Sequence, residues 1–241
     1  MKTKFKNIII AEIGSNHDGK LSLAKKHVLA AKKCNADYVK FQMHIAEEET
    51  LKKAPSPDYF KDEDRFSYFK RINFSFKEWK KLKNFCKLNN IGFLCSPFSI
   101  KAVDIMENLG VKLYKVPSGE LTNLPLLERL KKTKKHIILS TGMSNYFEIK
   151  QAAKTLKKNF SILQCTSIYP CPSSKAGLNV YENLKKKYKC EIGYSDHTLD
   201  FSSAFAFAAN GASIIEKHFT LSKKLYGSDA KHSMEQKEFK F

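Results

Sequence analysis

The sequence predicts an α/β fold, a TIM (β/α)8 barrel, in a single domain over residues 1–241. Short apolar runs alternate with amphipathic helical segments along the chain, and the length suits one barrel of this kind. Two of the last apolar runs end in polar turns that contain a histidine. Active sites of such barrels are built at the carboxyl ends of the strands, so these turns also point to a functional site.

The predicted strands are rich in Val, Ile and Leu, and a nearly continuous apolar run is typical of a strand buried on both faces. This composition favours a closed parallel barrel over a doubly wound open sheet, although the alternation of strands and helices fits both. The predicted strands occupy residues 8–14, 37–42, 91–96, 112–118, 136–141, 161–166, 190–195 and 212–218.

Amphipathic helices are predicted between the strands. In the first, Leu21, Ala24 and Val28 fall on one face. Ser75 followed by Glu78 is a capping-box signature and predicts the start of a later helix.

The connection after the second predicted strand, residues 43–74, is unusually long and polar and contains Pro55 and Pro57. Connections of this length are uncommon in compact domains unless they have a function. We therefore expect an active-site loop here.

The chain ends shortly after His218, where the eighth helix of a barrel would begin. We therefore expect a barrel that is incomplete at the eighth helix, with the apolar edges of its first and last units uncovered and a dependence on association.

The formal net charge of +19 raises the question of nucleic-acid binding. The lysines, however, recur in pairs and triplets on the polar sides of successive helical segments, which is typical of a solvated surface. We expect no nucleic-acid partner.

No run reaches the ~18 apolar residues of a membrane helix, the amino terminus does not resemble a signal peptide, and the six cysteines form no C-x-x-C pair. These features predict a cytoplasmic protein with reduced thiols and no membrane partner.

Polar side chains lie at or just after the ends of the predicted strands. Because the carboxyl ends of all strands in a barrel open at one mouth, we expect these side chains to converge there. They are Glu12, Lys40, Gln42, Ser96, Lys115, Ser118, Glu120, Ser140, Thr141, Ser167, Tyr169, Ser195, His197 and His218.

Lys40 and Lys115 lie inside otherwise apolar strands, where an ammonium group is costly to bury without an anion. A phosphate or carboxylate of a ligand would supply that anion, and the hydroxyls of Ser118 and Ser195 suit a phosphate. These residues indicate a phosphorylated, carboxylated small substrate. An ion pair between Lys40 and Glu12 in the core is the alternative, structural role for Lys40.

His197 and His218 end neighbouring predicted strands and could share one metal ion. Glu216, two residues before His218, faces the same side of its strand. Asp196 is expected to be a local anchor. The other histidines have no predicted chemistry beyond a structural place for His17 and surface or loop positions for His27, His44, His136 and His232.

Beyond the individual residues, a series of motifs recurs in a fixed order along the whole chain. They read IAEIGSNHDG, YVKFQ, SPFS, YKVPSGE, STGMS, QCTSIYPCP, GYSDHT, IEKHFT and YGSDAKHSM. This series resembles the motifs of the N-acetylneuraminate (sialic acid) synthase family. The resemblance implies a TIM barrel that condenses phosphoenolpyruvate with an N-acetylated mannosamine-type amino sugar, giving a nonulosonic acid and phosphate.

The resemblance also implies roles for individual residues. His197 and His218 would bind a divalent metal, commonly Mn²⁺, with Mg²⁺ or Co²⁺ as alternatives. Ser167 departs from family members that carry asparagine there, and Asp229 would lie near the sugar. Substrate contacts are expected at Lys40, Gln42, Ser96, Ser118, Ser167, Tyr169, Ser195 and Asp229, and catalytic roles at Glu12, Lys115 and Glu120.

Family members usually continue into a small antifreeze-like domain that reaches the partner subunit's sugar site, which implies a homodimer. Neither that domain nor its linker is expected in these residues. Alternatives to a working synthase are a truncated, weakly active or inactive remnant that still binds metal and phosphoenolpyruvate, and a basic binding protein on a barrel scaffold. Among enzymes, a related synthase acting on a phosphorylated sugar is the alternative. The sequence does not distinguish the neuraminic, legionaminic and pseudaminic routes.

Overall fold

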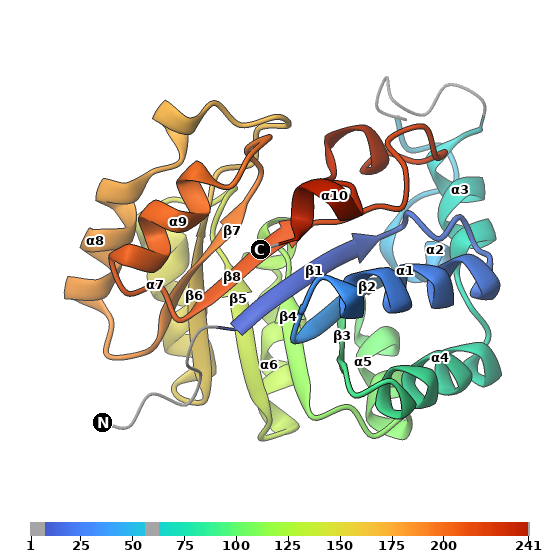
Figure 1. The fold of residues 1–241 in the computed structure, drawn as a ribbon. Coiled ribbons are helices and arrows are strands. Elements are labelled where there is room, and N and C mark those ends of the chain that lie inside the picture. Colours follow the sequence, from blue (N-terminus) through green and yellow to red (C-terminus); the bar gives the residue numbers. More distant parts are fainter. Residues whose placement is uncertain (1–7, 56–62, 241) are drawn as a thin grey trace.

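A computed structural model describes residues 8–55 and 63–240, and in it parallel strands surround a central axis with helices on the outside (Figure 1). The strands are β1 (Ile8–Gly14), β2 (Tyr38–Met43), β3 (Gly92–Pro97), β4 (Leu113–Val116), β5 (His136–Ser140), β6 (Phe160–Cys165), β7 (Ile192–Asp196) and β8 (Ile214–His218).

The strands follow one another around the sheet in the order β3-β2-β1-β8-β7-β6-β5-β4. β1 pairs with β8 from Ile8 opposite Ile214 to Glu12 opposite His218, which joins the first strand to the last. β3 and β4 lie next to each other without a run of paired residues among those described. The fold is therefore a nearly closed barrel, as predicted, and the doubly wound open sheet is excluded.

Alternation along the strands divides their side chains between the inside and the outside of the barrel. The outward side chains pack against the helices in the main core, where Trp79, Tyr114 and Tyr194 are fully buried. A separate apolar cluster of strand residues fills the inside of the barrel at its amino end. Its buried members are Ile10, Leu94, Leu113, Ile138, Leu163 and Ile214.

The helices cover the barrel between successive strands. α4 starts with the predicted capping box, in which Ser75 accepts from the backbone N–H of Glu78 and Glu78 accepts from that of Ser75. The helices are α1 (Leu21–Lys33), α2 (Ala46–Glu49), α3 (Arg65–Ile72), α4 (Phe76–Leu88), α5 (Ile100–Asn108), α6 (Leu124–Lys132), α7 (Tyr146–Leu156), α8 (Leu178–Lys187), α9 (Ser202–Ala209) and α10 (Gln236–Phe239).

Among the described residues, the helix that follows β8, α10, has four residues. Phe239 of α10 is nevertheless buried, with its ring 5.1 Å from Phe219 and 5.7 Å from Phe201 between centroids. Exposed apolar side chains lie instead between β7 and β8, where Phe205 of α9 and Leu199 in the turn before it are more than half exposed.

The long connection after β2 contains α2 and α3, and residues 56–62 within it, including Pro57, lie outside the described residues. α3 packs against the turn after β1, because the Tyr68 hydroxyl donates to Ser15 at 2.8 Å and Arg71 pairs with Asp18 at 2.6 Å. The six cysteines are free thiols, as predicted. Within the described ranges, no helix is both long and apolar enough to cross a membrane.

Candidate active site at the carboxyl end of the barrel

A ring of buried polar side chains lies directly above the apolar cluster inside the barrel. Because side chains on one face of a strand recur every second residue, each strand places a residue in this ring two positions after an inward residue of the lower layer. We call these residues the polar ring: Glu12, Lys40, Ser96, Lys115, Ser140, Cys165, Ser195 and Glu216.

Two carboxylates and two ammonium groups form a connected charge network in the polar ring. Lys40 Nζ lies 2.9 Å from Glu12 Oε1 and 3.5 Å from Glu216 Oε1, and Lys115 Nζ lies 3.4 Å from the same Glu216 oxygen. Ser195 donates to that oxygen as well, at 3.2 Å. The second oxygens of Glu12 and Glu216 are buried without a hydrogen-bond partner among the described residues. The pair of Lys40 with Glu12, the structural alternative for Lys40, is therefore present.

The two lysines differ in how fully their charge is compensated. Burial lowers the pKa of Lys40, but Glu12 and Glu216 outweigh burial and raise it to about 12. Burial also lowers the pKa of Lys115, and here Glu216 offsets the effect only in part. An anionic ligand would therefore stabilise the charge of Lys115 more than that of Lys40.

The carboxyls differ in the same way. Burial raises the pKa of Glu12, and the nearby charge of Lys40 offsets this only in part. Burial acts on Glu216 in the same direction, but Lys115 and Lys40 outweigh it and hold the pKa of Glu216 below its usual range. Glu216 is thus the more strongly stabilised anion of the network, whereas Glu12 takes up a proton more readily than an ordinary carboxylate.

Glu120 is the second predicted catalytic carboxyl, and it lies at the mouth in the 3-10 turn Ser118–Glu120 after β4. Asn123 donates to its Oε2 at 2.8 Å. Burial raises the pKa of Glu120, which Asn123 opposes. Both predicted acid–base candidates therefore have carboxyl groups whose pKa is shifted towards neutral pH.

Small side chains and backbone N–H groups surround Gly142, in the turn after β5. The Gly142 N–H donates to Ser118 Oγ at 3.0 Å. A Cβ atom at this glycine would lie 2.5 Å from Ser167 Oγ, 2.9 Å from Cys165 Sγ and 3.0 Å from Ser118 Oγ. A glycine is therefore required here for the hydroxyls of Ser118 and Ser167 to approach each other.

His197 and His218 lie together, as predicted, with 5.4 Å between their ring centroids. His197 Nδ1 lies 2.8 Å from the Thr166 carbonyl oxygen, and its Nε2 lies 3.0 Å from the Tyr169 hydroxyl. His218 Nδ1 is buried without a hydrogen-bond partner in the described part of the chain. Burial lowers the pKa of His218 to about 4, so its ring is neutral, which is the form that binds a metal.

The donor set fits a metal bound by two imidazoles. A carbonyl that holds His197 by Nδ1 is the outer contact usually seen for a metal-bound histidine, and the partnerless nitrogen of His218 provides a second donor. No group of three or more His, Cys, Asp and Glu side chains in residues 8–55 and 63–240 is arranged to hold a metal ion. A metal at this place would need water or substrate for its other ligands.

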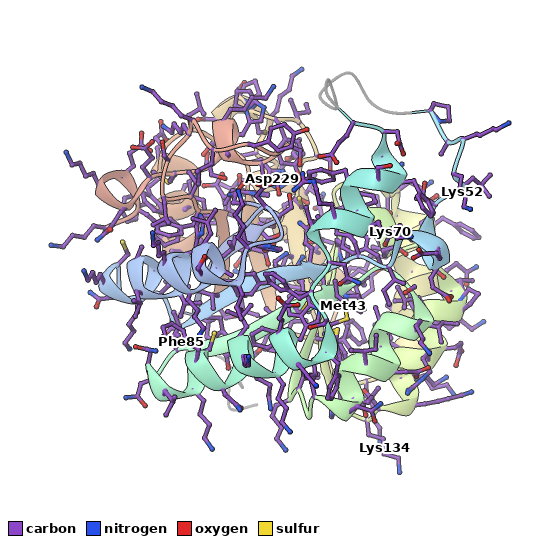
Figure 2. All side chains as sticks on the ribbon, turned by 90° about the vertical axis from the view of Figure 1, so that its right-hand side faces the viewer. Met43, Lys52, Lys70, Phe85, Lys134 and Asp229 are labelled. Atoms are coloured by element: carbon purple, nitrogen blue, oxygen red, sulfur yellow. The ribbon has the colours of Figure 1, made fainter. Side chains whose placement is uncertain are left out.

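Asp229 reaches the mouth from the segment after β8. Its Oδ2 would lie only 2.3 Å from a Cβ at Gly14, the last residue of β1, and Gln42 Nε2 would lie 3.3 Å from that same Cβ. In Figure 2, Asp229 lies near the top of the molecule and Lys134, in the turn before β5, at the bottom. Asp229 and Gln42 therefore meet at the open, carboxyl end of the barrel.

Some residues of the mouth have no role in the sequence-based prediction. Glu216 connects both lysines of the polar ring, and Cys165 lies 3.8 Å from His197 Nδ1. The expectation of surface or loop positions is wrong for His27 in α1 and His136 in β5, which are buried, whereas His44 lies in the loop after β2 as expected but is buried there. Asp196 is a local anchor as predicted, because it pairs with Lys217 at 2.8 Å.

With this geometry in view, a sequence model of the NeuB family matches residues 27–241. The chain belongs to the NeuB family. It is 42% identical over 246 residues to N,N'-diacetyllegionaminic acid synthase from Campylobacter jejuni, an alignment that covers 98% of this NeuB-family chain and 74% of the relative.

This NeuB-family chain is also similar to a second curated relative and to a protein of known crystal structure. N-acetylneuraminate-9-phosphate synthase from Mus musculus is 36% identical over 235 residues, which is 94% of this chain and 66% of the relative. The crystal structure of N-acetylneuraminic acid (sialic acid) synthetase from Leptospira borgpetersenii in complex with citrate superposes with a TM-score of 0.87 at 33% identity. That alignment covers 97% of this chain and 80% of the other.

Proposed function

We propose that this chain condenses phosphoenolpyruvate with an N-acetylmannosamine-type amino sugar, giving a nonulosonic acid and phosphate. The observation that supports this most strongly is the polar ring, in which Lys115 is a buried cation that Glu216 compensates only in part. A substrate with both phosphate and carboxylate groups would complete that compensation. The names of the relatives support the same class of reaction.

In this proposal, Lys115 and the hydroxyls of Ser96, Ser118 and Ser195 hold phosphoenolpyruvate over the polar ring. The amino sugar lies above it, against Asp229, Gln42, Tyr169 and Ser167. Binding both substrates in one buried mouth brings the reacting carbons together and excludes bulk water.

The bonds change as follows. C3 of phosphoenolpyruvate forms a bond to the aldehyde carbon of the open-chain sugar, and the aldehyde oxygen takes up a proton. Water adds to C2 and loses one proton to Glu12 or Glu120, which balances the proton taken up by the aldehyde oxygen. The bond between C2 and the phosphate oxygen then breaks, phosphate leaves with the electron pair of that bond and takes up the remaining proton of the added water, and the oxygen of that water becomes the C2 keto oxygen. Glu216 remains ionised throughout and stabilises the positive charge that develops at C2.

The proposal includes a divalent metal, Mn²⁺ with Mg²⁺ or Co²⁺ as alternatives, held by His197 and His218. When bound, it would act as a Lewis acid that polarises the aldehyde oxygen. The Tyr169 hydroxyl lies 3.0 Å from Nε2 of His197, the nitrogen left for the metal, so a bound metal would replace this contact and leave the Tyr169 hydroxyl for the sugar.

We also propose that the protein works as a homodimer. α9 buries Phe207 in the core while Phe205 and Leu199 next to it are 56% and 57% exposed, and apolar surface of this kind favours association. Sedimentation velocity should show twice the mass of one chain, and a single-chain mass at micromolar concentration would contradict this.

The experiment that tests the function measures phosphate release by chelator-treated protein from phosphoenolpyruvate, with N-acetylated amino sugars offered one at a time. We expect release that needs both the sugar and added Mn²⁺. Calorimetric binding of phosphoenolpyruvate without release would support the inactive remnant instead. Absence of both binding and release would contradict the proposal.

A further inference from the structure

His44, just after β2, is held in a tight aromatic sandwich at the mouth. Its ring centroid lies 4.0 Å from that of Phe69 in α3, with the planes only 2° apart, and 4.1 Å from that of Phe98, which follows β3. The side chain is 5% exposed. The ring can therefore neither turn nor move without displacing both phenylalanines.

Both nitrogens of His44 meet side chains that continue into the site. Nε2 lies 3.0 Å from Gln42 Oε1, and Nδ1 lies 2.8 Å from Glu49 Oε1 at the end of α2. Gln42 in turn donates from Nε2 to Glu12 Oε1 at 2.8 Å. These contacts link Glu12 of the polar ring through Gln42 and His44 to Glu49.

The direction of each hydrogen bond follows from the chemistry of its ends. A carboxylate oxygen only accepts, so Gln42 must donate to Glu12, and its amide oxygen is left to accept from Nε2–H of His44. On the other side of the ring, Nδ1 of His44 lies 2.8 Å from Glu49 Oε1, and this contact holds the ring in the orientation that directs Nε2–H at Gln42.

The charged and titratable groups that face His44 come from several elements. Besides Glu49 of α2, these groups include Glu120 in the turn after β4, His17 after β1, and Arg65 of α3, which lies within electrostatic reach of Glu120. The linked side chains therefore lie beside both candidate acid–base carboxyls, Glu12 and Glu120. Among the described residues, Glu49 Oε2 is buried without a hydrogen-bond partner, so Glu49 is held by His44 alone on its other oxygen.

We propose that His44 and Glu49 are positioning residues for the acceptor sugar, because they fix the amide of Gln42 with its N–H groups directed at Glu12 and at the space beside Asp229. This inference rests on the proposed function. The amide of Gln42 would otherwise be free to turn by half a rotation and present its oxygen to the carboxylates. Phosphoenolpyruvate contacts, by contrast, lie with Lys115, Ser118 and Ser195, and do not pass through His44.

Two variants of His44 separate positioning from packing. His44→Phe keeps an aromatic ring between Phe69 and Phe98 but removes both ring nitrogens, whereas His44→Gln loses the ring but keeps a donor at the place of Nε2. We expect His44→Phe to raise KM for the sugar at least about tenfold with the Kd of phosphoenolpyruvate within about twofold. His44→Gln should restore KM for the sugar to within about threefold of the parent.

The matched control is His136→Phe, which replaces a buried histidine at the opposite end of the barrel, where its ring contacts Ser161 at 2.7 Å. His136→Phe should alter thermal stability and leave the ratio of KM for the sugar to the Kd of phosphoenolpyruvate unchanged. Equal effects of His44→Phe on both substrates, or an unchanged KM for the sugar, would overturn the proposal.

A second measurement does not depend on activity or on the folding of any variant. In ¹⁵N-histidine-labelled parent protein, long-range ¹⁵N–¹H spectra should show Nε2 of His44 protonated. An unprotonated Nε2 would overturn the proposed hydrogen-bond chain. If the parent releases no phosphate with any sugar, the proposed function fails, and the spectrum still decides whether His44 orients Gln42.

Discussion

At the scale of single residues, the mouth of the barrel depends on how buried charges are compensated. Lys40 is held between Glu12 and Glu216, whereas Lys115 shares one oxygen of Glu216 with Lys40 and Ser195. Removing one partner of a buried pair leaves an uncompensated charge, which costs much more than the pair itself contributes. The two lysines should therefore respond differently to the same substitution.

We expect Lys40→Met to lower the free energy of unfolding by about 3 kcal/mol or more, because Glu12 and Glu216 lose their closest shared cation. Lys115→Met should cost less stability and at least about 100-fold in affinity for phosphoenolpyruvate, since Lys115 is the cation left for a ligand. Urea denaturation and calorimetry measure the two quantities. The opposite pattern, or a loss of affinity in Lys40→Met alone, would show that the ligand binds elsewhere.

A substitution at Gly142 tests whether the hydroxyls of Ser118 and Ser167, which lie close to this glycine, contact the ligand. An alanine Cβ would collide with Ser167, Cys165 and Ser118 together, so Gly142→Ala should weaken phosphoenolpyruvate binding by about tenfold or more. Gly119→Ala is the control, because the atom nearest to its Cβ would be Met143 Sδ at 4.0 Å. Equal affinities of the two variants would mean that the turn after β5 does not contact the ligand.

Much of the site was predictable from single residues, and the rest depends on contacts between distant segments. Lysines in apolar strands and serines after strand ends were visible because they break the pattern around them. Cys165 was not, since a cysteine in an apolar strand is typical of a core position. His44 was missed because its burial comes from Phe69 and Phe98, which approach it only in the folded barrel.

At the scale of elements, the positions of the strands could be predicted from the sequence. Strand bounds follow from apolar runs and agree with the structure to within two residues at every end. The largest differences include that of β7, which is predicted from Cys190 and begins at Ile192. The interior of α1 shows a further consequence of burial. His27 lies on its buried face, where Nδ1 contacts the Leu23 carbonyl oxygen at 2.9 Å, and Nε2 lacks a partner among the described residues.

His27 should make stability depend on pH. Burial lowers its pKa from an ordinary 6.5 to about 4, so between these values the unfolded chain binds a proton that the folded chain does not. Stability that is present above about pH 6.5 is therefore lost as the pH falls towards 4. His27→Leu should flatten the curve of unfolding free energy against pH by up to about 1.4 kcal/mol per pH unit in this window.

Urea denaturation between pH 4.5 and 7.5 measures this difference. Val28→Ala, a buried and non-titrating change on the same helix, is the control and should shift the curve by the same amount at every pH. Parallel curves for the parent and His27→Leu would contradict a neutral His27 in the folded state.

At the scale of the whole molecule, the residues that stabilise the barrel and the residues of the candidate site lie at different ends of its axis. The apolar cluster and the pairing of β1 with β8 hold the amino end together, while the polar ring and the turns above it form the mouth. The segment with α2 and α3 joins the mouth through Tyr68, His44 and Glu49. The described residues of the predicted active-site loop thus contact the mouth, although these contacts could not be derived from a polar segment with no periodic pattern.

The reaction in ¹⁸O-labelled water tests the central claim most directly. Phosphoenolpyruvate, Mn²⁺ and an accepted amino sugar are incubated with the protein, and the nonulosonic acid and the phosphate are analysed by mass spectrometry. Attack of water at C2 with cleavage of the C2–O bond predicts ¹⁸O in the sugar acid and none from solvent in the released phosphate. Label in the phosphate and not in the acid would mean that water attacks phosphorus, and would contradict the proposed condensation.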